Sequence, residues 1–128
     1  MTSGLVSLCY VSSARQVMSA GELEQLLLES RERNRDSDIT GMLIHHDGSF
    51  MQVLEGPAKS IEDTFARIQR SRRHGDIIEL YRDAVEERDF GEWRMACRRV
   101  GRAAFDELLE AQTSTRHELL REFARGCR

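Results

Sequence analysis

The sequence predicts an α+β fold in which a single sheet carries two helices on one face. Two observations predict it. Short apolar runs of strand length alternate with segments whose apolar residues recur at helical spacing, and an Asp-Gly pair separates two of the strand-like runs. The length of 128 residues leaves room for one domain with one hydrophobic core.

The first strand and the first helix are marked by local signals. Residues 5–10 form a short apolar run bounded by polar residues, which is typical of a buried strand. Ser19 and Glu22 have the spacing of a capping box, in which each side chain satisfies an otherwise unpaired backbone N–H at a helix start. The polar run 34–38 predicts the end of this helix. Its apolar face consists of Leu23, Leu26 and Leu27.

A hairpin follows. Residues 39–46 and 49–55 are apolar runs joined by Asp47-Gly48, and both central residues of a type I′ turn need positive φ, which Asp and Gly tolerate. Pro57 suits the start of a second helix, because the first helical residues have no intrahelical partner for their N–H. Ile61, Phe65 and Ile68 give that helix its apolar stripe, and we expect it to run to about Arg72.

Residues 77–85 and 93–100 are predicted as two further strands, and two short helices follow around Phe105 and Leu120. The order β-α-β-β-α-β folds most simply as a ferredoxin-like sheet in which the first and third strands are neighbours. The prediction is therefore a ferredoxin-like core with a fifth strand and two C-terminal helices. We expect residues 1–100 to form the core and residues 101–128 to form a helical extension that packs on the core or on a partner.

Composition excludes several classes of function. A formal net charge of −3 argues against nucleic acid as the main partner. No run approaches the roughly 20 apolar residues that span a bilayer, and the N-terminus lacks a signal-peptide pattern, so we expect a cytoplasmic protein without membrane contact. The cysteines Cys9, Cys97 and Cys127 lack the spacing of a zinc site, and no metal is expected.

The first and third strands can bring a phenol and an amide together. Alternation along a strand places Val6, Leu8 and Tyr10 on one face, and Phe50, Gln52 and Leu54 on one face of the third strand. A Gln in an apolar strand is seldom buried unless its amide has partners. Gln52 therefore either pairs with Tyr10 inside the core, or lies on the solvent face or bonds to a loop backbone. Patterning alone favours the solvent face or the loop backbone.

A longer pattern changes this balance. Its segments are Tyr10 with Ser12, Asn34, Ile39-Thr40-Gly41, Phe50-Met51-Gln52-Val53-Leu54-Glu55-Gly56, Arg73-His74 and Trp93-Arg94-Met95. In order and spacing, from about residue 5 to residue 100, they resemble the BLUF family of flavin-binding blue-light sensor domains. The Ile-Thr-Gly and Gln-x-Leu-Glu-Gly segments are specific in combination.

The resemblance implies a role for each matching residue. Tyr10 matches a redox-active tyrosine, Gln52 the glutamine between that phenol and the flavin, and Asn34 an asparagine at the polar edge of the ring. Trp93 and Met95 match a pair on the last core strand whose placement is coupled to the glutamine, so the implied photoactive set is Tyr10, Gln52, Trp93 and Met95. The implied flavin-binding residues are Tyr10, Ser12, Asn34, Gln52, Arg67, Arg73 and His74.

The implied mechanism is light-driven electron and proton transfer from Tyr10 through Gln52. It rearranges hydrogen bonds to the flavin C4 carbonyl without net redox change, and passes a signal to the last strand, the C-terminal helices and a separate effector protein. FAD is the expected flavin, with FMN or riboflavin as alternatives, and a homo-oligomer is expected. Two positions depart from the family pattern: Arg33 stands where Asn or His is common, and Ser71 where Asp is common.

Two alternatives remain at this point. Small acyl-phosphate hydrolases share the ferredoxin-like core, and Arg15 with Asn34 would be their reactive pair, although this rests on fold analogy and leaves Tyr10 and Gln52 unexplained. A degenerate module that binds no flavin and only oligomerises is the second. No partner for His117 is evident from the sequence.

Overall fold

The computed structural model describes residues 4–16, 18–125 and 127, and the side chain of His74 lies outside the described part. Its elements follow one another in the order β1 (Leu5–Ala14), α1 (Ala20–Asp36), β2 (Thr40–His46), β3 (Ser49–Pro57), α2 (Ala58–Arg70), β4 (His74–Val85), β5 (Ala96–Arg99), α3 (Arg102–Glu110) and α4 (Thr113–Ala124).

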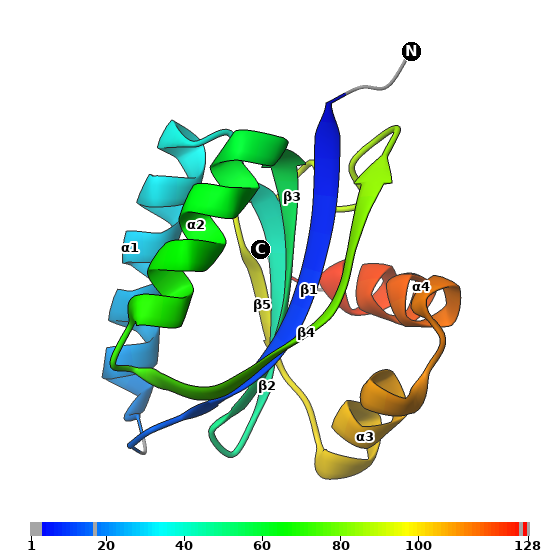
Figure 1. Ribbon diagram of the computed structural model, residues 1–128. Coiled ribbons are helices and arrows are strands. Elements are labelled where there is room, and N and C mark those ends of the chain that lie inside the picture. Colours follow the sequence, from blue (N-terminus) through cyan, green and yellow to red (C-terminus); the bar gives the residue numbers. More distant parts are fainter. Residues whose placement is uncertain (1–3, 17, 126, 128) are drawn as a thin grey trace.

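The strands form one five-stranded sheet in the order β4-β1-β3-β2-β5. All neighbours are antiparallel except β2 and β5, which are parallel. Helices α1 and α2 cover one face of the sheet, while α3 and α4 lie on the other (Figure 1). The ferredoxin-like α+β arrangement with a fifth strand and two C-terminal helices is therefore confirmed, as is the adjacency of the first and third strands.

The local signals act as their chemistry predicts. The Ser19 Oγ accepts from the N–H of Glu22 at 3.1 Å, and the Glu22 carboxylate accepts from the N–H of Ser19 at 3.2 Å, which completes the capping box of α1. In the hairpin, Asp47 and Gly48 have φ values of 42° and 82°, as a type I′ turn requires. Helix α2 ends two residues before the expected Arg72, because Ser71 adopts an extended backbone.

The last core strand is shorter than predicted. Pairing with β2 begins only where Ala96 meets Met42, so Trp93 and Met95 lie in the loop before β5 rather than on the strand. This connecting loop, residues 86–95, leads from β4 at one edge of the sheet to β5 at the other. It is folded by a turn, in which the N–H of Trp93 donates to the carbonyl of Phe90 at 3.0 Å, and by a bond from the N–H of Gly41 to the carbonyl of Trp93 at 3.1 Å.

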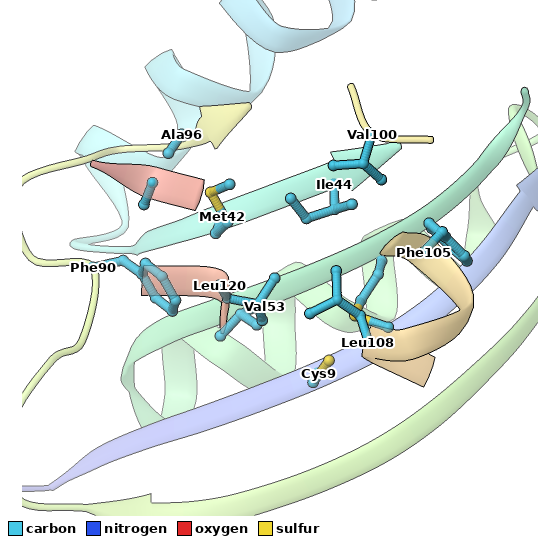
Figure 2. Packing of buried hydrophobic residues seen from close by; sticks show 12 residues of the cluster. Cys9, Met42, Ile44, Val53, Phe90, Ala96, Val100, Phe105, Leu108 and Leu120 are labelled. Atoms are coloured by element: carbon cyan, nitrogen blue, oxygen red, sulfur yellow. The ribbon is translucent and has the colours of Figure 1, made fainter. Parts of the chain in front are cut away.

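Two apolar clusters lie on the two faces of the sheet. The cluster beneath α3 and α4 combines residues from the strands, from the loop before β5 and from both C-terminal helices (Figure 2). Its labelled members are Cys9, Met42, Ile44, Val53, Phe90, Ala96, Val100, Phe105, Leu108 and Leu120. Full burial of one large apolar side chain contributes about 1.5–3 kcal/mol, so Leu108 and Leu120, at 0% and 1% exposed, fasten the C-terminal helices to the sheet.

The second cluster lies beneath α1 and α2. Its buried members are Leu8, Tyr10, Ile39, Leu43, Phe50, Leu54, Ile61, Phe65 and Met95. In the described part of the chain, no helix has the length and apolar character that crossing a membrane requires.

Candidate functional site

A cavity of about 400 Å³ lies between the sheet and the helices α1 and α2. The sheet provides its floor and the helices its walls. Its lining residues are Tyr10, Leu26, Leu27, Glu29, Ser30, Arg33, Asn34, Leu43, Phe50, Gln52, Leu54, Thr64, Arg67, Ile68, Arg70, Ser71, Arg73 and Met95. Small-molecule sites have this size and this mixture of apolar walls with a few polar groups.

A hydrogen-bonded chain of three buried side chains lies on the floor of the cavity. Tyr10 and Gln52 are register partners on β1 and β3, so their side chains leave the sheet side by side on the helix-covered face. The Tyr10 hydroxyl donates to Gln52 Oε1, and Gln52 Nε2 donates to the sulfur of Met95 at 3.3 Å. Gln52 is only 8% exposed and its amide bonds to side chains, so the prediction that patterning alone favoured, a Gln52 on the solvent face or bonded to a loop backbone, is wrong.

The surroundings of Tyr10 keep its phenol neutral. The side chain is 1% exposed, and the ring of Phe65 from α2 lies 5.4 Å away between centroids. Burial disfavours the phenolate, and this raises the pKa of Tyr10 above its ordinary value. The hydroxyl therefore stays protonated and donates a hydrogen bond to the amide oxygen of Gln52.

Asn34 joins the last turns of α1 to the connecting loop. Its Nδ2 donates to the carbonyl of Arg94 at 2.6 Å, and the side chain is 4% exposed. One turn earlier, the Nε of Arg31 donates to the carbonyl of Met95 at 3.1 Å. The wall of the cavity thus holds the backbone of the loop whose Met95 side chain contacts Gln52.

The mouth of the cavity is basic. Its lining includes Arg33, Arg67, Arg70 and Arg73, and Glu29 is the one carboxylate among the described lining residues. The Glu29 Oε2 accepts from Arg33 at 3.4 Å and from Arg73 at 3.3 Å. A hydrogen bond from Gln25 and then the bond from Arg73 hold the pKa of Glu29 below its usual range. An anionic group is the complement of such a mouth.

Most of the residues that the resemblance singled out come together here. Tyr10, Asn34, Gln52, Arg67, Arg73 and Met95 all line the cavity, and so do both departures from the family pattern, Arg33 and Ser71.

Three of the expected residues do not take part in the same way. Ser12 is buried on β1 but is not among the described residues that line the cavity, and the side chain of His74 lies outside the described part. Trp93 packs on the opposite face of the sheet and lines a separate surface hollow with Arg88 and Asp89. Of the expected pair, only Met95 contacts Gln52. On a strand, residues two positions apart share one face, but Trp93 and Met95 lie in an irregular loop, where this rule does not hold.

Arg15, the residue on which the hydrolase alternative depends, is exposed beyond the end of β1 and is not among the described lining residues. The cavity also has walls that the sequence analysis did not assign to a site. Leu26 and Leu27 line it from α1, Thr64 and Ile68 from α2. Their only signal in the sequence is helical spacing, which apolar core residues share.

Fold and cavity together define an α+β domain with a cavity of small-molecule size between its sheet and two helices. The family described as sensors of blue-light using FAD, BLUF, matches residues 5–96, and the chain belongs to this family.

Relatives and solved structures agree with this family. The photoactivated adenylate cyclase subunit beta of Euglena gracilis is 34% identical over 92 residues, which are 71% of this chain and 11% of that protein. The blue light- and temperature-regulated antirepressor BluF of Escherichia coli (strain K12) is 31% identical over 107 residues, 84% of this chain and 27% of that protein. The chain thus spans only a small part of these curated relatives.

Among solved structures, BlrB, a BLUF protein in its dark state, superimposes with a TM-score of 0.82 at 28% identity and covers 98% of both chains. The photo-activated state of BlsA gives a TM-score of 0.82 at 26% identity, with 94% of both chains covered. The likeness therefore extends over the C-terminal helices as well as the core.

Proposed function

We propose that this chain binds a flavin non-covalently in the cavity and serves as a blue-light sensor whose response is a change in the hydrogen bonds of Gln52. The observation that carries the proposal is the buried chain Tyr10–Gln52–Met95 on the cavity floor. An amide with a phenol on one side and a thioether on the other has a strong partner and a weak one. Such an amide can exchange the weak partner for a better one.

The residues of the cavity fit a flavin. Leu27 and Ile68 offer apolar walls from opposite helices to a flat ring, while Asn34 and Gln52 offer amides to its polar edge. The arginines at the mouth, Arg67 and Arg73 among them, suit the phosphate groups of FAD or FMN. FAD is the flavin we propose, on the strength of the family description.

When bound, the flavin supplies light absorption and the oxidising power of its excited state. The protein supplies a phenol that can give up an electron while its proton leaves along an existing hydrogen bond to Gln52 Oε1. Return of the electron and the proton restores neutral Tyr10 and leaves no net redox change. The carboxamide of Gln52, rotated or tautomerised, keeps a different set of bonds, and the Met95 sulfur loses its donor.

The output is proposed to pass through residues 86–95 to α3 and α4, and from there to a separate effector protein. We propose that residues 1–100 form the sensor core, that residues 101–128 form the extension that covers the second face of the sheet, and that the chain self-associates. The domain performs no catalysis of its own in this proposal. The structure of Klebsiella pneumoniae BlrP1 with FMN and cyclic diGMP, of which this chain covers 30% at 30% identity, is an example of the domain within a longer chain.

The test is the absorbance spectrum of the protein reconstituted with FAD, in the dark and after blue light. We expect a flavin band that shifts reversibly to the red. Tyr10→Phe should keep the colour and lose the shift, because it removes the electron and proton donor but little volume. The chain has two tyrosines, so Tyr81→Phe, on the other face of the sheet, is the matched control and should keep the shift.

Two results would contradict the proposal. Protein that stays colourless with FAD, FMN and riboflavin would rule out the flavin site. A red shift that persists in Tyr10→Phe but disappears in Tyr81→Phe would mean that the photochemistry takes place on the other face of the sheet, away from Tyr10.

A further inference from the structure

His117 on α4 is the centre of a hydrogen-bonded cluster on the face of the sheet opposite the cavity. Its Nδ1 lies 2.5 Å from Asp89 Oδ2 in the connecting loop, and its Nε2 is bonded to the hydroxyl of Tyr81 on β4. The Ser7 Oγ on β1 lies 3.5 Å from the same hydroxyl. We call Tyr81, Asp89 and His117 the clasp. His117 lies beyond residues 5–96, so the clasp joins the family domain to the rest of this chain.

The chemistry of the clasp orders its protons. A carboxylate can only accept a hydrogen bond, so Nδ1 of His117 is protonated and donates a hydrogen bond to Asp89. In the neutral imidazole, Nε2 then accepts from Tyr81, and burial raises the pKa of the Tyr81 phenol above its ordinary value, so this donor keeps its proton. Both ring nitrogens are thereby engaged, and the side chain of His117, 13% exposed, is held from two different elements.

Asp89 is itself fixed to the strand that carries Gln52. The Glu55 carboxylate, on β3 three residues after Gln52, accepts from the N–H of Asp89 at 2.6 Å and from the N–H of Phe90 at 2.9 Å. It also accepts from the Thr40 hydroxyl at 3.2 Å. Glu55 is 1% exposed, so these bonds form away from water, where an unpaired carboxylate would be costly.

The same connecting loop ends at the cavity. Six residues after Asp89, the Met95 sulfur accepts from Gln52, and the Met95 carbonyl accepts from Arg31. Gln52 therefore reaches α4 by two short routes that converge on Asp89. One passes along β3 through Glu55, and the other passes along the loop from Met95.

We propose that the clasp couples the cavity to α4, with His117 as the positioning residue: a change at Gln52 and Met95 moves the connecting loop, strains the bond from His117 to Asp89 and loosens α4 from the sheet. This inference rests on the proposed light response. A hydrogen bond weakens steeply as its distance and angle depart from ideal, so a small movement of the loop suffices. Helix α4 is drawn on the far side of the sheet from α1 and α2 (Figure 1).

Cys127 provides an intrinsic reporter of α4. It follows the helix, and its thiol donates to the carbonyl of Cys97 on β5 at 3.2 Å. We expect blue light to raise the rate of Cys127 alkylation by about tenfold, which lies within the roughly 5- to 150-fold range of couplings between sites. Peptide mass spectrometry measures this rate. His117→Ala should show fast alkylation already in the dark and little further effect of light, while it keeps the red shift of the flavin band.

Two variants control for loss of structure. Glu118→Ala removes an exposed side chain next to His117 and should behave like the wild type. Asp89→Asn keeps an oxygen that accepts from His117 Nδ1, so it should largely retain the light dependence, whereas Asp89→Ala should lose it.

A second measurement needs no light. Coupling between two sites is reciprocal, so release of α4 must alter the surroundings of Met95. In protein labelled with ¹³C-methyl methionine, with Met95→Leu to assign the signal, His117→Ala should shift the Met95 methyl resonance in the dark and Glu118→Ala should leave it unchanged.

An unchanged Met95 signal in His117→Ala would overturn the inference. So would light-independent alkylation of Cys127 in protein whose flavin band shifts. If the band itself does not shift, the proposed function fails, and the Met95 resonance still decides whether the clasp couples the two faces.

Discussion

At the scale of single residues, the site depends on groups that have partners of unequal strength. Gln52 is buried in an apolar strand, and both ends of its amide are bonded, one to the Tyr10 phenol and one to the Met95 thioether. Sulfur is a weak acceptor, so the bond to Met95 is the easier one to give up. The buried amide is therefore fully hydrogen-bonded in this structure, and in the proposed light response it exchanges its weaker partner.

Gly41 shows how closely the segments approach around this amide. A Cβ at this position would overlap the carbonyl oxygen of Val53 and lie 3.3 Å from the Met95 methyl group. We expect Gly41→Ala to lower the free energy of unfolding by about 1–3 kcal/mol, the usual cost of overpacking. Urea denaturation measures it, with Gly21→Ala as the control. Gly21 is exposed in α1, and a Cβ added there would have its nearest heavy atom at 4.0 Å. Gly21→Ala should therefore raise the free energy of unfolding by about 0.5–1 kcal/mol. Equal effects at both glycines would contradict the close approach at Gly41.

At the scale of elements, α1 is the helix whose stability depends most on the contacts at its two ends. Asn34 is its only buried residue in the described structure, while Leu26 and Leu27 are partly exposed toward the cavity. A helix with so little burial gains much of its stability from capping and from specific contacts. The capping box holds its start, and the bonds of Arg31 and Asn34 to the connecting loop hold its end.

Loss of the cap should therefore be felt in α1. We expect Ser19→Ala to cost about 1 kcal/mol of stability and to speed amide hydrogen exchange in the first turn of α1. Ser114→Ala is the matched control, because Ser114 is exposed in the first turn of α4, whose N-cap makes no side-chain bond. A Ser19→Ala variant no less stable than Ser114→Ala would show that the box contributes nothing.

At the scale of the whole molecule, one sheet separates two different interiors. The face beneath α1 and α2 holds the cavity and the buried Tyr10, and the face beneath α3 and α4 holds the second, partly buried phenol, Tyr81. Neighbouring residues of a strand point to opposite faces, so β1 and β3 contribute to both interiors. A change of bonding on one face therefore has a short path to the other.

The two phenols make stability depend on alkaline pH. Burial raises the pKa of Tyr10 and of Tyr81 above the ordinary value of 10.0. Above that pH the unfolded chain releases phenolic protons that the folded chain keeps, so the free energy of unfolding falls as pH rises, by up to about 1.4 kcal/mol per pH unit for each phenol. Burial raises the pKa of the Cys9 thiol to about 12, which acts in the same direction.

Urea denaturation between pH 8 and pH 11 measures this dependence. The slope against pH should be shallower in Tyr10→Phe and in Tyr81→Phe than in the wild type, whatever their absolute stability. Slopes unchanged by either substitution would mean that neither phenol is shielded from water in the folded protein.

Local signals were read correctly from the sequence because their physics is local. The capping box of Ser19 and Glu22, the turn at Asp47-Gly48 and the alternation that places Tyr10 each involve residues only a few positions apart. The resemblance to the family added what alternation could not decide, namely that Gln52 faces the cavity. Helix α1, the hairpin and most of the cavity floor follow from these.

The sequence by itself determined the order of the elements and the pairing of a phenol with an amide. Only the tertiary structure decided that Met95 and not Trp93 reaches Gln52, and that His117 has partners after all. Those contacts join residues 28 to 43 positions apart across an irregular loop and a separate helix. Neither segment has a periodicity that sets the direction of its side chains toward a distant strand, so packing of the whole chain makes that choice.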